Sequence, residues 1–562
     1  MGPLKMPVTV STVLRNKDYN KDTAFTDAER ESHHIVARLP ARVETLEQQI
    51  SRCRTQFDAL TTPVEKWLYL TRLQEVNETL FSGFCLKYLK EVLPIVYTPT
   101  VGTGCSNYSL LWQGCPRGFY LNRTHLGKVR QILDQWPYSP RIIVATDGTR
   151  ILGLGDLGTG GHHICVGKLT LYSLGGGFAP EHTLPISFDF GCDTDKIRDC
   201  PHYLGVPEKR NKDDAYYRII KETIDAVRSK WPDCIFQFED FSNDTAFTLL
   251  DTHRNAGPVF NDDIQGTGCI AAATVAAGLR AISLKAYKTV KASEQVYVMY
   301  GAGAGGIGVA DNIASLSVDE GLTIEQARKQ FYVIDSKGLL TADRDDFVQG
   351  TIAKHKLPYV RHDVSIKGHT TLLDVVKALK PTCLLGLSTI AKSFTREVLD
   401  AMCKGLPANQ APIVLALSNP TEKCECTFAE CMEYTNNTAY YASGSPMPSL
   451  TLPNGTVVQP AQCNNFYVFP GIGLGAYVCR AKKITDEMII GVSSALAKMV
   501  PEEKLLRGEL LPDLDDIRSI SCQCALGLIR VAEKQGNARR VLPSSDTDLL
   551  AQLKEIQWSP KY

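Results

Sequence analysis

Residues 296–306 decide the fold: the apolar run Val296-Tyr297-Val298-Met299-Tyr300 leads directly into the loop Gly301-Ala302-Gly303-Ala304-Gly305-Gly306. Apolar residues at helical spacing follow over 309–316. This order of strand, glycine loop and helix is typical of a dinucleotide-binding unit, because the glycines permit a tight turn and let the pyrophosphate approach free N–H groups at the helix start. The spacing of Gly301, Gly303 and Gly306 therefore predicts a Rossmann-like domain.

A second apolar run, 331–334, ends at Asp335, where the second strand of such a domain carries the acid that binds ribose hydroxyls. The acid lies farther from the glycine loop than the usual distance of about 20 residues. An inserted helix accounts for the difference, since Thr323 to Gln326 have the spacing of a capping box.

The residues after this strand leave the choice of dinucleotide open. Asp335 favours NAD, which has a free ribose 2′-hydroxyl. Ser336, Lys337 and Arg344 can instead hydrogen-bond and neutralise the 2′-phosphate of NADP. The residues by themselves therefore indicate both cofactors.

Apolar and turn-forming segments elsewhere indicate an α/β protein with a helical N-terminal region. We expect helices over 41–60 and 64–93, then an extended segment at 95–97. Strands are predicted at four further places, 142–145, 151–154, 183–189 and 234–238. Because predicted strands alternate with helices, the sheet should be mainly parallel.

Composition restricts the class of protein. A chain of 562 residues is long enough for about three or four folding units. With 44% hydrophobic and 22% charged residues it is neither disordered nor collagen-like. Its 61 basic and 61 acidic residues give no electrostatic reason to expect nucleic acid as a partner. The uninterrupted apolar run over 269–279 stops at Arg280, short of the ~20 residues of a membrane helix, so no membrane partner is predicted.

Eighteen cysteines are scattered through the chain without a compact framework, which predicts reduced thiols and a cytoplasmic location. Cys424, Cys426 and Cys431 are expected to be free thiols. The N-terminal stretch carries Lys5 among its basic residues, but it is short and contains prolines, so a mitochondrial location is less favoured. The adjacent His162 and His163 are expected in a loop.

Four acids stand at two successive predicted strand ends: Glu239, Asp240, Asp262 and Asp263. Strand ends face the ligand crevice of an α/β sheet. Carboxylate oxygens without His or Cys partners suit Mg²⁺ or Mn²⁺ and not zinc. A single pair of this kind is more often a solvated loop or a helix cap, and the aromatic neighbours weaken that alternative, because acids beside aromatics are costly unless they are compensated.

Three further residues are candidates for chemistry. Lys168 follows a glycine-rich loop and has apolar neighbours, where a lysine can act as a base. By residue type alone, a lysine is more often exposed on the surface. Likewise, a tyrosine such as Tyr97 more often serves packing, and an arginine such as Arg150 is more often solvated.

Taken together, these residues resemble the malic enzyme family, the metal-dependent oxidative decarboxylases of malate, over nearly the whole stretch from Leu14 to about Lys534. The resemblance rests on long segments that do not depend on the glycine loop. They are 95–102 (IVYTPTVG), 146–156 (TDGTRILGLGD), 260–267 (FNDDIQGT) and 417–421 (LSNPT).

The resemblance implies a role for each candidate. Glu239, Asp240 and Asp263 would bind Mn²⁺ or Mg²⁺, and Arg150 would bind a carboxylate of L-malate. Lys168 would be the general base, helped by Asp262, and Tyr97 the acid that protonates the enol. Asn419 and Asn464 would hold substrate near the nicotinamide.

The resemblance also implies a domain order in which the dinucleotide domain lies between two stretches of the substrate domain. We expect a helical N-terminal domain (1–115), the first part of a substrate- and metal-binding α/β domain (116–262), an NAD(P)-binding Rossmann-like domain (263–463), a return segment (464–535) and a C-terminal extension (536–562). A homotetramer, as a dimer of dimers, is expected from the family.

The chain departs from the family pattern in three places. The loop over 162–168 (HHICVGK) differs from a family pattern of small or apolar residues with proline, and Cys463 stands where glycine is usual. Val76 replaces an arginine that fumarate-activated relatives use, so activation by fumarate is not expected.

We therefore predict a malic enzyme that converts L-malate to pyruvate and CO₂ and prefers NADP, because Asp335-Ser336-Lys337 with Arg344 resembles members that accept a 2′-phosphate. The alternatives are an NAD-preferring malic enzyme, an amino-acid dehydrogenase, and a nucleotide-sensing protein without catalysis.

Overall fold

The computed structural model describes residues 12–114, 117–408, 410–453 and 455–562 and divides into two compact units. Unit 1 runs to Cys234 and includes Glu555–Tyr562, and unit 2 is Ile235–Lys554. The basic Lys5 lies outside the described residues. The sequence predicted a division into five segments, which is more detailed than these two units. The boundaries of the five segments stay a prediction.

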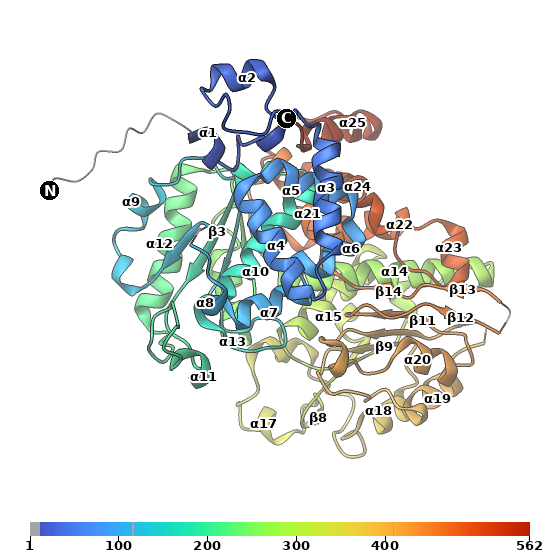
Figure 1. Ribbon diagram of the computed structural model, residues 1–562. Coiled ribbons are helices and arrows are strands. Elements are labelled where there is room, and N and C mark those ends of the chain that lie inside the picture. Colours follow the sequence, from blue (N-terminus) through green and yellow to red (C-terminus); the bar gives the residue numbers. More distant parts are fainter. Residues whose placement is uncertain (1–11, 115–116, 409, 454) are drawn as a thin grey trace. The chain divides into compact units, whose positions relative to one another are not determined.

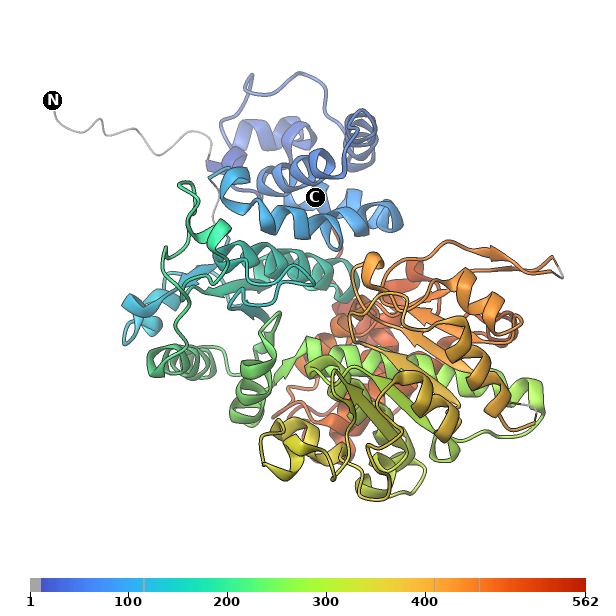
Figure 2. The same ribbon diagram turned by 90° about the horizontal axis from the view of Figure 1, so that it is seen from below.

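Unit 1 begins with a group of helices that pack on one another, drawn in blue in Figure 2. The predicted start of one of them is confirmed, since the Thr62 side chain and Glu65 form a capping box and Pro63 occupies the first turn. The main helices of the group are α3 (Leu46–Asp58), α4 (Pro63–Val76), α5 (Glu78–Lys87), α6 (Leu89–Val96) and α7 (Thr100–Ser106).

The other half of unit 1 is built on three parallel strands. β3 (Thr183–Phe188) pairs with both β1 (Phe119–Leu121) and β2 (Ile142–Thr146). Every residue of β2 is buried, as expected for a strand covered on both faces. Helix α10 (His162–Leu171) packs against β2 and β3. The remaining long helix is α12 (Asp214–Lys230).

Two predictions for unit 1 are wrong. Residues 95–97 are not extended, because Ile95 and Val96 belong to α6 and Tyr97 caps its end. Pro94 lies inside this helix, and burial of the apolar face outweighs its local preference against helix. Residues 151–154 form a turn closed by a bridge between Ile151 and Gly155, where a strand was expected.

Unit 2 contains a sheet that, in the described part of the chain, has seven strands in the order β14-β11-β10-β9-β6-β7-β8. All its pairings are parallel except that of β7 with β8. The strands are β6 (Tyr297–Tyr300), β7 (Phe331–Asp335), β8 (Gly338–Leu339), β9 (Cys383–Gly386), β10 (Ile413–Ala416), β11 (Tyr440–Ser443) and β14 (Ala461–Gln462). The predicted Rossmann-like domain is confirmed.

Helices cover both faces of this sheet (Figure 1). On one side lie α14 (Thr267–Ala286) and α15 (Ala304–Asp319), and on the other α18 (Leu372–Leu379), α19 (Arg396–Gly405) and α20 (Phe428–Tyr434). A further layer consists of α21 (Phe469–Val478), α22 (Asp486–Met499) and α24 (Ile517–Lys534), which pack on one another, and α22 also packs on α14. The predicted inserted helix is α16 (Ile324–Arg328), with the Thr323–Gln326 capping box present.

The apolar segment near Arg280 is longer than the uninterrupted run suggested. Asp262–Ala286 is apolar and long enough to cross a membrane by length and composition, but 72% of its apolar window is buried inside the structure. Its apolar surface is therefore used to pack against the rest of unit 2.

Candidate functional site

Three of the predicted metal ligands gather in unit 2. One carboxylate oxygen each from Glu239, Asp240 and Asp263 lie within 4.8 Å of one another. Glu239 and Asp240 are buried, and Asp263 is half-buried. Three carboxylates this close repel one another when ionised, so a cation among them would remove a large electrostatic penalty. Hard oxygen donors of this kind fit Mg²⁺ or Mn²⁺.

The local fold explains how these acids meet. β4 (Ile235–Phe238) and β5 (Val259–Asn261) pair in parallel, so their carboxyl ends lie at the same edge. Asp240 has a φ of 56°, the left-handed region that non-glycine residues rarely adopt, and its N–H donates to a carboxylate oxygen of Asp263 at 2.8 Å. Gln237 donates to Glu239 Oε2 at 2.7 Å. Neighbouring donors thus hold the carboxylates in fixed orientations.

Asp262, the fourth acid, is fully buried at the start of the turn that follows β5. Asn465 Nδ2 donates to its Oδ2 at 2.8 Å and to Thr267 Oγ1 at 3.1 Å. Asn464, which the resemblance assigns to substrate binding, accepts the Phe466 N–H at its Oδ1 at 2.9 Å. Sequence reasoning did not single out Asn465, because its contact with Asp262 joins residues about 200 positions apart.

Tyr97 and Lys168 are brought together within unit 1. Tyr97 closes α6, Lys168 lies on α10, and Lys168 Nζ is 5.1 Å from the centre of the Tyr97 ring. Both are buried, and Lys168 is only 1% exposed. A lysine beside an aromatic face is held by a cation–π contact. The common alternative of a surface lysine therefore does not apply to Lys168.

Arg150 is exposed at the end of the turn that follows β2. Within this turn, Asp147 Oδ1 accepts the Thr149 N–H at 3.0 Å, and Asp147 Oδ2 accepts the Tyr216 hydroxyl at 2.8 Å. The Leu157 N–H donates to the Gly148 carbonyl at 3.0 Å. The turn is thus fixed from both sides, which orients the backbone at Arg150.

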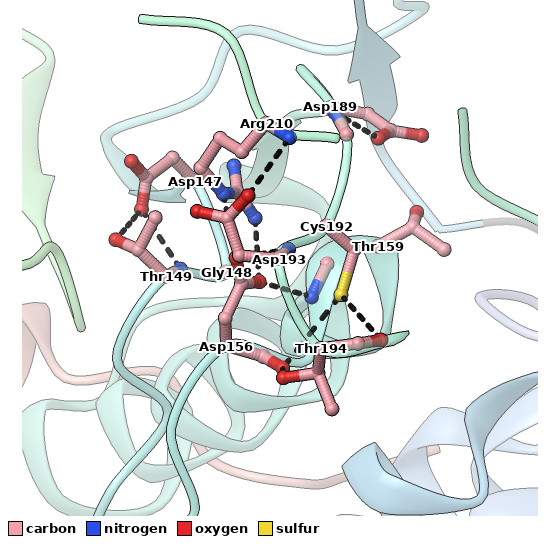
Figure 3. A network of polar contacts seen from close by, with 12 residues as sticks. Asp147, Gly148, Thr149, Asp156, Thr159, Asp189, Cys192, Asp193, Thr194 and Arg210 are labelled. Carbon is pink, nitrogen blue, oxygen red and sulfur yellow. Dashed lines mark hydrogen bonds and ion pairs between the residues drawn. The ribbon is translucent and has the colours of Figure 1, made fainter. Parts of the chain in front are cut away.

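A buried ion pair supports the same region (Figure 3). Asp156 receives two hydrogen bonds from Arg210, at 2.7 and 2.8 Å, and further N–H donors from Gly158 and Asp193 at 2.9 Å. Burial raises the pKa of Asp156, but the Arg210 guanidinium and these donors outweigh it and hold the pKa below its ordinary value. The Arg210 side chain is 2% exposed.

Removing one partner of this pair should be costly. Arg210→Met leaves the Asp156 carboxylate buried without its cation, and we expect a loss of about 3 kcal/mol in the free energy of unfolding. Arg123→Met breaks the exposed pair with Asp213 and should cost less than about 1 kcal/mol. Urea titration followed by circular dichroism measures both. Equal losses in the two variants would show that the Asp156–Arg210 pair has no special structural role.

The glycine loop follows β6 as predicted and opens α15. Gly301 has a φ of 122°, and a Cβ there would lie 2.5 Å from the Leu387 carbonyl carbon, so only glycine fits. Gly303 is the N-cap residue of α15, and Gly306 lies in its first turn. The Ala304 N–H at the start of this helix donates to Asn243 Oδ1 at 3.2 Å. The positive end of the helix still faces the glycine loop, where a pyrophosphate would be expected.

The predicted ribose acid, Asp335, ends β7 and is neutralised by basic residues. Arg344 donates to both of its oxygens, at 2.9 and 3.2 Å, and Lys356 donates to Oδ2 at 2.8 Å. Arg344 is 4% exposed and also binds Asp346 at 2.6 Å. Its guanidinium is therefore committed to two aspartates, although the sequence suggested that it would face a phosphate.

Lys356 was missed by sequence reasoning, because it lies 21 positions after Asp335 in a separate turn, η8 (Lys354–Tyr359). Lys337 is 65% exposed beside the same acids, with Nζ 3.4 Å from Asp346. The structure thus places two lysines where the ribose 2′ position of a bound dinucleotide would be expected.

Asn419 follows β10 and is exposed. Ser445 donates to its Oδ1 at 2.6 Å, and its amide nitrogen lies 3.4 Å from the Leu417 carbonyl. The carboxamide is therefore held at the carboxyl edge of the sheet, where the ligand crevice of such a fold lies.

The histidine prediction is wrong, whereas the thiols are as expected. His162 and His163 begin α10 and do not lie in a loop; His162 stacks on Tyr120 and His163 contacts Trp67 edge to face. Burial lowers the pKa of His162 to about 4. Each of the 17 described cysteines is a free thiol, including Cys424, Cys426 and Cys431.

Comparison with known proteins covers most of the chain. Residues 74–254 match the family "Malic enzyme, N-terminal domain", and residues 264–533 match "Malic enzyme, NAD binding domain". The chain is 42% identical to the NADP-dependent malic enzyme of Dictyostelium discoideum over 98% of each chain. It is 37% identical to the NAD-dependent malic enzyme of Shewanella denitrificans over 100% of this chain and 98% of that one.

The fold agrees with a solved structure. The crystal structure of Entamoeba histolytica malic enzyme matches with a TM-score of 0.57 at 22% identity, covering 93% of this chain and 90% of that chain. Family membership decides against the amino-acid dehydrogenase alternative. The chain therefore belongs to the malic enzyme family and is an NAD(P)-dependent oxidoreductase that carries out the oxidative decarboxylation of malate.

Proposed function

We propose that this malic enzyme oxidises L-malate with NADP as its preferred cofactor and requires Mn²⁺ or Mg²⁺ bound by Glu239, Asp240 and Asp263. The observation that carries the proposal is the gathering of three carboxylate oxygens within 4.8 Å. A divalent cation there would supply Lewis-acid polarisation of the substrate oxygen and stabilise the negative charge that develops on it.

Side chains of the protein carry out the proton transfers. Lys168 takes the proton from the C2 hydroxyl as the hydride leaves C2 for the nicotinamide ring, and Tyr97 supplies the proton to C3 after CO₂ departs. The contact between Lys168 Nζ and the Tyr97 ring supports this pairing. Asp262, held by Asn465, assists the base.

Substrate orientation is assigned to three side chains. Arg150 binds a malate carboxylate through its guanidinium, and the fixed turn that carries it supports this role. Asn419 and Asn464 offer carboxamide groups to the substrate and the nicotinamide. Orientation of this kind lowers the barrier because the reacting groups are already placed.

NADP preference is supported by the charges around Asp335. Arg344 and Lys356 neutralise this acid, so it does not repel a 2′-phosphate, and Lys337 and Lys356 can donate to the phosphate oxygens. Asp335 and Ser336 complete the ribose site. The similar proteins include both NADP- and NAD-dependent malic enzymes.

The double substitution Lys337→Gln with Lys356→Gln should raise the KM for NADP by about a hundredfold, because it removes two charged hydrogen bonds that contribute roughly 1.5 kcal/mol each at the lower end of their range. The KM for NAD should change much less. Lys354→Gln removes an exposed lysine from the same turn and serves as the control. Arg344→Ala should impair both cofactors, since it leaves two aspartates without their shared cation. Equal effects of the double substitution on the two cofactors would refute the assignment.

The experiment that tests the whole proposal is reduction of NADP and of NAD by the purified protein with L-malate, with and without Mn²⁺, while pyruvate and CO₂ are trapped. Metal-dependent reduction with equal amounts of pyruvate supports the proposal, and the two kcat/KM values rank the cofactors. Oxaloacetate without CO₂, or activity unaffected by metal removal, would overturn it. Nucleotide binding without turnover would favour the nucleotide-sensing alternative.

We also propose a cytoplasmic homotetramer, a dimer of dimers. The free thiols support a reducing compartment. Sedimentation of the purified protein and fractionation of the source cells test the two statements separately.

A further inference from the structure

Glu425 is a buried acid that the reaction described above does not use. It lies between η9 (Thr421–Lys423) and α20 in unit 2 and is 0% exposed. No ion pair to Glu425 occurs within the described residues, so its hydrogen-bond donors are all neutral. A carboxyl group that is buried without a cation is unusual and is costly unless donors surround it.

The donors come from the two loops that follow β9 and β10. Ser418 donates its hydroxyl to Glu425 Oε1 at 2.5 Å and its N–H to Oε2 at 3.3 Å. Ser388 donates its N–H to Oε1 at 3.3 Å, and its hydroxyl lies at 3.4 Å. One carboxylate therefore ties together the loops at the carboxyl ends of two neighbouring strands.

The hydrogen-bond network around Glu425 also includes a residue with a strained backbone. The Ser418 hydroxyl accepts the N–H of Thr389 at 2.9 Å, and Thr389 has a φ of 60°. A β-branched residue in the left-handed region costs about 1–3 kcal/mol and persists only where its surroundings hold it. The backbone around Glu425 is also shaped for it, because a Cβ at Gly386 would lie 2.5 Å from the Glu425 carboxyl carbon.

Sheet order predicts which half of a bound dinucleotide would extend over these loops. The glycine loop follows β6, and the ribose acid Asp335 ends β7 on one side of it. The adenosine half therefore extends over β7, and the nicotinamide half extends over the other side, where β9 and β10 lie. Leu387, in the loop after β9, abuts Gly301 of the glycine loop. Glu425 thus holds the two loops on the side of the sheet where the nicotinamide half is expected.

We propose that Glu425 is a positioning residue for the nicotinamide half of the cofactor. It fixes the 386–390 and 417–419 loops. It also places a buried negative charge that favours the oxidised, cationic ring over the reduced, neutral ring. The ring accepts a hydride, two electrons and one proton, from C2 of malate and thereby loses its positive charge. A fixed negative charge near the ring would bind the oxidised form more tightly, because the attraction disappears on reduction.

Burial raises the pKa of Glu425 above its ordinary value, while the Ser418 and Ser388 donors favour its ionised form. The inference rests on the family's use of a nicotinamide cofactor and not on the proposed NADP preference or metal site.

The test compares binding of oxidised and reduced cofactor by Glu425→Gln, using the nucleotide that the wild-type protein reduces faster. Calorimetry gives Kd for the oxidised form, and nicotinamide fluorescence gives Kd for the reduced form, both without malate. We expect the ratio of oxidised to reduced Kd to rise at least about threefold, with kcat falling about tenfold. An unchanged ratio together with an unchanged kcat would overturn the inference.

Two variants make the result specific. Glu422→Gln removes an exposed acid from the same loop and should leave both the ratio and kcat unchanged. Ser418→Ala removes the shortest hydrogen bond to Glu425 and the hydroxyl that accepts the Thr389 N–H, so kcat should fall. If Glu425→Gln does not fold, a Ser418→Ala variant with normal kcat would by itself refute the positioning role. Failure of the proposed NADP preference would appear in the wild-type protein and is therefore distinguishable.

Discussion

Asp263→Asn is expected to lower kcat/KM for malate about a thousandfold, since metal polarisation contributes several kcal/mol to the transition state. Asp263 is one of three carboxylates whose oxygens lie within 4.8 Å of one another, and it also accepts the Asp240 N–H. An amide cannot offer the same negative charge to a cation. Mn²⁺ binding, followed by calorimetry, should weaken in parallel with turnover.

Asp251→Asn is the matched control, because it makes the same charge change at an exposed position of α13 (Asn243–His253) in the same unit. It should leave Mn²⁺ binding and turnover unchanged. Glu239→Gln tests a second carboxylate of the cluster and should resemble Asp263→Asn. An Asp263→Asn protein that retains both Mn²⁺ affinity and activity would remove these acids from the proposed metal site.

Lys168→Met is expected to reduce kcat by about a thousandfold, within the range of 10²–10⁴ typical of a positioned general base. Methionine fills a similar volume in this 1%-exposed position but cannot accept a proton. Cofactor and Mn²⁺ binding should remain near normal, since unit 2 holds the residues proposed for both. Steady-state kinetics with separate binding measurements tests this expectation.

Lys66→Met provides a control of the same kind in the same unit. Lys66 Nζ lies 4.7 Å from the centre of the Phe57 ring, so the variant also loses a cation–π contact. Turnover should be unaffected. If Lys168→Met and Lys66→Met behave alike, the lysine on α10 is structural and the base has to be sought elsewhere.

Local sequence patterns predicted the dinucleotide domain well. β7 has the predicted bounds, and the Thr323–Gln326 capping box is present at the start of α16. Such features depend on residues close in sequence, on alternation of apolar side chains and on capping hydrogen bonds. The wrong predictions, such as an extended 95–97, concern segments whose conformation depends on burial against distant parts of the chain.

The sequence predicted which residues belong to the candidate site, but it did not predict which of them contact one another. Glu239, Asp240 and Asp263 meet because β4 and β5 are parallel neighbours, which the alternation of strands and helices suggested. The hydrogen bond from Asn465 to Asp262 depends on the direction in which the Asn465 side chain points. Sequence spacing contains no such information.

The sequence by itself determined the family, the glycine loop, the acids at the strand ends and the types of residue available for catalysis. Each of these can be recognised in a short contiguous segment. The tertiary structure alone decided which charges compensate one another. Arg344 is committed to two aspartates, Lys356 reaches Asp335, and Glu425 is buried among hydroxyl and N–H donors. Electrostatic and hydrogen-bond energies depend on separations of a few ångströms between residues far apart in the chain, and only folding sets those separations.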